Sequence, residues 1–186
     1  MLQRLCNDSF AFWRGTEALH MRAQAASFET GADPLLAVEA AAEGLGWSAL
    51  RSAPEELLLA AALPSLNVQF SVQWLAGEEL LQITAMWDMR IPRERRAAAA
   101  ALVQLVNTRL PLGHFELWDD DGVVVLRHAQ MALPGSGADE EQATRLLQRL
   151  SEACARYHPA FQFVVWAGKE PRAALDACLF ETLGEA

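Results

Sequence analysis

The sequence has little cysteine and no long apolar run. Its three cysteines, Cys6, Cys154 and Cys178, are odd in number and widely spaced, and none belongs to a CxxC pair. This spacing predicts neither a disulfide framework nor a zinc site, and reduced thiols are typical of the cytoplasm. The first residues lack the continuous apolar region of a signal peptide, and no run approaches the roughly 18 residues that span a bilayer. We therefore expect a cytoplasmic protein without a membrane segment.

Basic residues are also scarce. The chain carries 24 acidic and 15 basic residues, which gives a net charge of -9. Such a charge repels a phosphate backbone, so we expect no nucleic-acid partner. The densest basic cluster consists of Arg90, Arg93, Arg95 and Arg96, where a predicted strand runs into a predicted helix. We interpret this cluster as a solvated helix start or a local salt bridge.

The sequence contains none of the common catalytic motifs. There is no GxSxG, no HExxH and no glycine-rich dinucleotide fingerprint. The run Asp119–Asp121 lacks the glutamate that ends a calcium loop, because valines follow it. Gly168-Lys169 lacks the earlier glycine of a phosphate loop. We therefore expect no enzymatic activity and no cofactor.

Enough apolar residues are present to form a core. The hydrophobic fraction is 52% and the charged fraction 21%, which excludes disorder of the whole chain. A chain of 186 residues suits one domain with a short extension. Asp33-Pro34 is a strong helix start, so we predict a leader over residues 1–33 and a domain over residues 34–186.

The apolar periodicity predicts an α+β fold. In Leu66–Trp74 apolar and polar residues alternate, as in a strand with one buried face, and the Asp-Asp-Asp-Gly sequence before Val123 suits a hairpin turn. The predicted order is α-β-β-β-α-β-β-α-(β)-α, an antiparallel sheet packed by helices. In chain order, the elements are a helix over 34–45, a region of three strands that Trp47 opens, with strand patterns over 57–63, 66–74 and 81–90, a helix over 92–110, strands over 113–119 and 123–133, a helix from 139 that ends before Pro159, a short strand over 161–166 and a helix over 171–183.

Two histidines and one glutamate form a candidate metal site. His114 and Glu116 share a face of the first strand of the predicted hairpin, and His128 lies on its second strand. Two imidazoles and a carboxylate could bind a divalent ion. The alternative interpretation is a hydrogen-bonded surface patch, and we favour it because no second set of polar partners accompanies the three residues.

Six tryptophans and eight phenylalanines supply candidate anchors for a protein partner. Trp74 and Trp87 lie on apolar alternating faces and are expected in the core. Trp118 and Trp166 are the better candidates for exposure. Phe12 and Trp13 lie in the leader, where an aromatic pair could contact the domain or another subunit.

Several phrases in a fixed order resemble one bacterial family. They are NTRLPLGHFELW over residues 107–118, the Asp-Asp-Asp-Gly turn, LRHAQMAL, RYHPAFQFVVWAGKEPRAAL and the ending LFETLGEA. Together they are similar to proteins of the YbjN family, in the version found in alphaproteobacteria. The resemblance implies a fold similar to type III secretion chaperones, a role in regulating sensory transduction, and no enzyme activity. It also implies binding of extended protein segments and dimerisation.

Three functions follow as hypotheses. The first is a noncatalytic regulatory or chaperone-like module of the YbjN type that binds an unidentified protein. The second is a metal-dependent hydrolase or metal sensor that uses His114, Glu116 and His128. The third is a homodimeric scaffold in which a sheet edge or an apolar helix face pairs with its twin.

Overall fold

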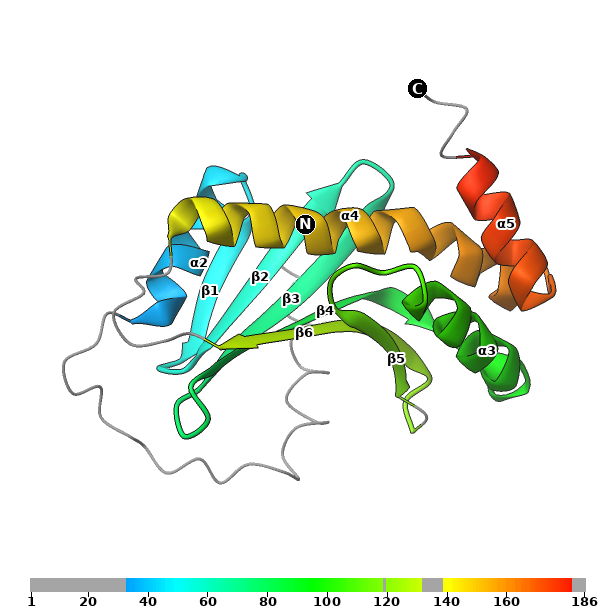
Figure 1. Ribbon diagram of the computed structural model, residues 1–186, viewed down its shortest axis with the longest axis horizontal. Coiled ribbons are helices and arrows are strands. Elements are labelled where there is room, and N and C mark those ends of the chain that lie inside the picture. Colours follow the sequence, from blue (N-terminus) through cyan, green and yellow to red (C-terminus); the bar gives the residue numbers. More distant parts are fainter. Residues whose placement is uncertain (1–32, 119, 132–138, 182–186) are drawn as a thin grey trace, which may run out of the picture. The chain divides into compact units, whose positions relative to one another are not determined.

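A six-stranded antiparallel sheet with helices packed on it forms the domain (Figure 1). The computed structural model describes residues 33–118, 120–131 and 139–181. The predicted α+β class and antiparallel sheet are confirmed. In chain order the elements are α2 (Pro34–Gly44), β1 (Ser48–Ala53), β2 (Glu56–Leu63), β3 (Leu66–Leu75), β4 (Leu80–Arg90), the 3-10 turn η1 (Arg93–Arg95), α3 (Arg96–Asn107), β5 (His114–Trp118), β6 (Val123–Met131), α4 (Glu140–Val165) and α5 (Pro171–Glu181).

The strands lie in the order β1-β2-β3-β4-β6-β5. The predicted hairpins are confirmed: β3 pairs with β4, with Phe70 opposite Ala85, and β5 pairs with β6, with Phe115 opposite Leu126. The turn between β5 and β6 requires a glycine at position 122. The φ of Gly122 is +66°, and a Cβ atom there would lie 2.5 Å from the Ile91 carbonyl oxygen, so a larger residue would be excluded by backbone atoms.

The first part of the sheet has four strands, not the three that we predicted. The additional strand is β1, whose residues Ser48–Ala53 pair with β2. It lies at the edge of the sheet, and most of its side chains are short and partly exposed. An edge strand of this kind needs no clean alternation of apolar and polar residues, which explains why the strand pattern that opens at Trp47 did not distinguish β1 as a separate strand.

The predicted strand over residues 161–166 is wrong. Helix α4 continues through Pro159 to Val165, and its residues Tyr157, Phe161 and Val164 are buried at helical spacing. A proline inside a helix costs about 3 kcal/mol, because it removes one hydrogen bond and crowds the preceding turn. Burial of this apolar stripe outweighs that cost. The Cys178 thiol also donates to the Arg156 carbonyl at 2.9 Å, beside the proline.

One apolar core lies between the helices and the sheet. Its centre is aromatic: the Trp87 ring lies 5.8 Å from both the Phe115 and Phe161 rings and 5.6 Å from the His158 ring. In Figure 1, α4 crosses the sheet, with α2 near its first turns and α3 and α5 near its last turns. Cys154 and Cys178 are both buried.

The other face of the sheet has a buried stripe of its own. Leu58, Met86, Val123 and Val125 are buried there but do not belong to the core cluster. Ser71 and Thr84, directly opposite each other on β3 and β4, are 2% and 3% exposed. The simple alternation in the sequence predicts a solvated face here, and that prediction is wrong at the centre of the sheet. Solvated side chains on this face lie toward the ends of the strands.

Candidate functional site: two candidate protein-binding sites

The first candidate site is a cluster on β5 and β6. His114, Glu116 and Trp118 share one face of β5, and Arg127 lies opposite His114 on β6. The Glu116 carboxylate binds all three neighbours: Oε1 lies 2.8 Å from His114 Nε2, and Oε2 accepts from Trp118 Nε1 at 3.1 Å and lies 3.3 Å from Arg127 Nη2. Both carboxylate oxygens therefore have partners within the cluster.

The charge of Glu116 follows from these contacts. Partial burial alone would raise the pKa of the carboxyl group. The hydrogen bonds from Trp118 and His114 and the positive charge of Arg127 outweigh burial and lower the pKa below 4.5. The carboxylate is therefore ionised at neutral pH, and its oxygens are already engaged. A general base needs a free oxygen facing its substrate, so this geometry favours a hydrogen-bonded patch.

His128 does not join the cluster. The register places His114 opposite Arg127, so His128, one residue further, points to the opposite face with Ile83. The predicted metal site of His114, Glu116 and His128 is therefore wrong in its third member. Within the described ranges, no group of three or more His, Cys, Asp or Glu side chains could hold a metal ion.

The second candidate site lies at the end of α4. Trp166 directly follows the helix and is 70% exposed. Its backbone N–H donates to the Gln162 carbonyl at 2.8 Å. Gly168 then takes a left-handed φ of +63°, and the Lys169 N–H donates to the Phe163 carbonyl at 3.0 Å. Trp166 is thus an exposed aromatic side chain on a turn held by backbone hydrogen bonds.

Cationic side chains surround this turn. The Arg95 guanidinium packs against Gly168, where Nη2 lies 2.9 Å from the position a Cβ atom would occupy. The Lys169 ammonium lies 4.3 Å from the centre of the Phe163 ring, a cation–π contact. Sequence reasoning interpreted Arg95 as part of a solvated helix start and missed this contact, because residues 95 and 168 meet only in the folded chain.

The other predicted anchors are placed differently. Trp118 is half-buried within the Glu116 cluster, and Trp87 is buried in the core as expected. Trp74 is partly buried and packs against the core. Phe12 and Trp13 lie outside the described residues.

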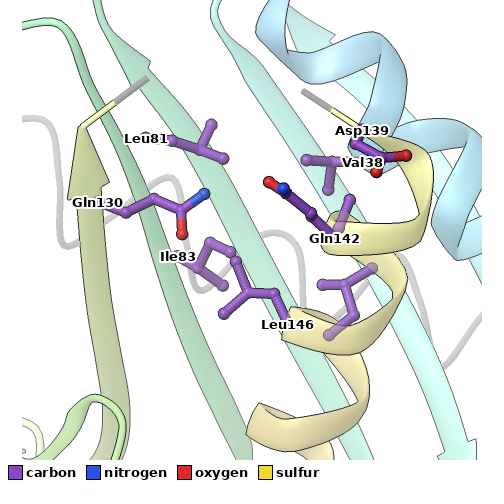
Figure 2. A pocket seen from close by; sticks show the side chains of 9 residues that line it. Val38, Leu81, Ile83, Gln130, Asp139, Gln142 and Leu146 are labelled. Carbon is purple, nitrogen blue, oxygen red and sulfur yellow. The ribbon is translucent and has the colours of Figure 1, made fainter. Parts of the chain in front are cut away.

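A small hollow between α2, α4 and the sheet is a poor ligand site. Figure 2 shows the Gln130 and Gln142 side chains extending into the space between β6 and α4. Its volume is about 30 Å³, and Leu81, Ile83 and Leu146 contribute apolar walls. That volume holds about one water molecule, whereas small-molecule sites typically measure about 300–1,000 Å³.

The fold and these sites define an α+β domain with an antiparallel sheet and an exposed tryptophan at the end of its longest helix. A family model described as "Putative bacterial sensory transduction regulator", named YbjN, matches residues 34–163. The chain belongs to the YbjN family. Among solved structures, it is similar to one described as "Crystal structure of YbjN, a putative transcription regulator from E. coli". That match has 15% sequence identity and a TM-score of 0.48, and it covers 82% of this chain and 94% of the other.

No curated protein matches the chain. No helix in the described parts of the chain has the length and apolar character needed to cross a membrane.

Proposed function

We propose that this chain is a noncatalytic regulatory module that acts by binding another protein. The observation that carries the proposal is the 70% exposure of Trp166 on a structured turn. Tryptophan is enriched among the residues that dominate binding energy at protein interfaces, because its large rigid ring buries much apolar area at little entropic cost. The description of the family as a regulator supports the regulatory part of the proposal.

The Glu116 cluster supports the noncatalytic part. Both oxygens of its carboxylate are bound to neighbouring side chains. Trp118 belongs to the same cluster and is a second candidate anchor. Phe12 and Trp13 complete the proposed set of binding residues.

Further parts of the proposal extend beyond the binding site. We propose that residues 34–186 form the functional domain and residues 1–33 a leader, that the protein acts in the cytoplasm, and that it is the alphaproteobacterial version of the family. The Asp33 side chain, which accepts from the Leu35 N–H at 3.0 Å at the start of α2, supports the domain boundary.

The test compares two exposed apolar residues. The immobilised full chain is incubated with a native bacterial lysate, and retained proteins are identified by mass spectrometry for the wild type, Trp166→Glu and Leu36→Glu. Leu36 is 56% exposed on α2 and serves as the matched control. We expect a specific protein that Leu36→Glu retains and Trp166→Glu loses. Retention of the same proteins by both variants, or of none by the wild type, contradicts the proposal.

A second copy of the chain is the other partner that we propose. Light scattering over a range of concentrations measures the association directly. A molar mass that rises toward twice 20.4 kDa with concentration supports a homodimer. The mass of one chain at every concentration contradicts it.

A further inference from the structure

The cations around Trp166 differ from five arginines elsewhere in the domain, which are paired with carboxylates. Arg51, Arg109, Arg127, Arg145 and Arg149 each lie within 4.0 Å of a carboxylate oxygen. Four cations on the two segments that meet at Gly168 make no ion pair within the described part of the chain, namely Arg93, Arg95, Lys169 and Arg172. In a protein with a net charge of -9, acidic partners are plentiful, so this grouping is a distinctive surface feature.

The acidic residues nearby do not cancel this charge. Glu170 is occupied at the start of α5, where its carboxylate accepts from the Ala173 N–H at 3.1 Å. Glu94 is exposed in η1. Arg95 and Lys169 contact the turn at Gly168 or the helix end that precedes it, whereas Arg93 and Arg172 lie on the same two segments of the chain. Of the two carboxylates on these segments, the one of Glu170 already caps a helix.

Two of the cations are held in place. Arg95 is half-buried and packs against Gly168, and Lys169 lies over the Phe163 ring. Side chains fixed before binding lose less conformational entropy when a partner arrives. We call the group formed by Trp166, Arg93, Arg95, Lys169 and Arg172 the Trp166 surface.

We infer that the Trp166 surface binds an acidic segment of the partner protein, an inference that rests on the proposed function. Guanidinium and ammonium groups pair with the carboxylates of Asp and Glu through charge-assisted hydrogen bonds, and the indole ring packs against an apolar side chain of the same segment. The combination fits a short segment in which acidic and large apolar residues alternate. Nucleic acid fits less well, because its charge continues over many nucleotides and so extends from these few cations onto the acidic remainder of the chain, whereas a short acidic segment does not.

The direct test uses defined peptides with the full chain. A fluorescent peptide of alternating Glu and Leu is compared by anisotropy with a peptide in which Lys replaces every Glu, and with a single-stranded DNA oligonucleotide. We expect the Glu peptide to bind at least about tenfold more tightly than the Lys peptide, which corresponds to about 1.4 kcal/mol. Its affinity should fall as salt is raised. Equal binding of both peptides, no binding of either, or tighter binding of the oligonucleotide overturns the inference.

Charge reversal locates the binding surface. Lys169→Glu changes an exposed side chain and is expected to weaken binding of the Glu peptide about tenfold. Arg95→Glu is the second variant, with its fold checked by circular dichroism because Arg95 packs against Gly168. The control is Arg145→Glu/Arg149→Glu at the other end of α4, which should leave the affinity unchanged.

The cations could instead serve only to stabilise the end of α4. In that case Lys169→Glu lowers thermal stability without changing peptide affinity, and the inference fails.

The lysate experiment separates this inference from the proposed function. If Trp166→Glu loses the captured protein whereas Lys169→Glu and Arg95→Glu retain it at all salt concentrations, the protein-binding function stands and its acidic specificity is rejected. If Trp166→Glu retains that protein, both are rejected.

Discussion

The two ends of α4 differ in how their side chains are stabilised. At the start, the Asp139 carboxylate accepts from the Glu141 N–H at 3.1 Å, and Glu141 pairs with Arg145 at 2.7 Å. At the end, Pro159 interrupts the backbone hydrogen bonds, and burial of Phe161 against Trp87 and Phe115 holds the helix. The first end is thus stabilised by local contacts, and the second by the core of the domain.

This difference bears on function. Charged side chains at the start of α4 find partners along the same helix, as Arg149 does with Glu152 at 3.3 Å. At the other end the core holds the backbone, so surface residues are not needed to stabilise the helix. This is consistent with the binding role that we propose for Trp166, which is exposed, and Lys169. Changes at the two ends should produce unequal losses of stability, and the following predictions begin with the largest.

Removal of the Phe161 ring should have the largest effect. Phe161 is fully buried and contacts two other aromatic rings. We expect Phe161→Ala to lower the free energy of unfolding by about 3–5 kcal/mol, as measured by urea denaturation, because it leaves a cavity in the core. The control is Gln148→Ala on the exposed side of the first half, expected within about 0.5 kcal/mol of the wild type. A loss below about 1 kcal/mol for Phe161→Ala would show that the core does not hold this end of the helix.

The turn after α4 should be the next most sensitive. Gly168 has a φ of +63°, and an added Cβ would press on the Arg95 guanidinium. Gly168→Ala is expected to cost about 1–2 kcal/mol, because an L side chain in the left-handed region is strained. Gly44→Ala is the matched control: no atom lies within 4 Å of the added Cβ, so stability should be unchanged or slightly higher. Equal effects of the two substitutions, measured by thermal denaturation, would contradict the assigned role of Gly168.

The same contrast between local and tertiary effects explains which features could be predicted from the sequence. The alternation in Leu66–Trp74 and the glycine at 122 are local signals, and both hairpins followed from them. The continuation of α4 through Pro159 was missed because proline is a strong local signal to stop, whereas the burial that overrides it depends on the sheet. Strand β1 was missed because its exposed edge position leaves little apolar pattern.

The candidate sites were less predictable than the fold. The pairing of His114 with Glu116 follows from a spacing of two residues on one strand. The face of His128 depends on the register between β5 and β6, and a shift of one residue reverses it. The contact between Arg95 and Gly168 is a tertiary contact without a local signal. Exposure of Trp166 was expected because a Gly-Lys-Glu-Pro turn follows it, and the cations that surround it were not.

Protonation of His158 should produce a smaller, pH-dependent effect near the end of α4. His158 is 9% exposed beside the Trp87 ring, and burial lowers its pKa from the usual 6.5. The unfolded chain binds this proton more readily than the folded chain. The contribution of neutral His158 to the free energy of unfolding should therefore be fully present above pH 6.5 and be lost progressively as the pH falls below that value. The slope for one proton is at most about 1.4 kcal/mol per pH unit.

Urea denaturation from about pH 8 to about pH 5 measures this slope. His158→Leu should reduce the slope of the free energy of unfolding with pH. His128→Gln should reduce the part of that slope that comes from His128, whose pKa is also lowered by burial. A pH profile that is identical in the wild type and in His158→Leu would contradict the role of His158.

The smallest effect is expected at the start of α4, and it tests the comparison from the opposite side. The Arg145 and Glu141 side chains are 61% and 71% exposed, so water and salt screen their attraction. An exposed pair of this spacing contributes about 0.3–0.5 kcal/mol. A double-mutant cycle of Arg145→Ala and Glu141→Ala should give a coupling energy of that size that decreases in high salt. A coupling above about 2 kcal/mol would mean that this end also depends on a strong individual contact, and the contrast with the Phe161 end would no longer hold.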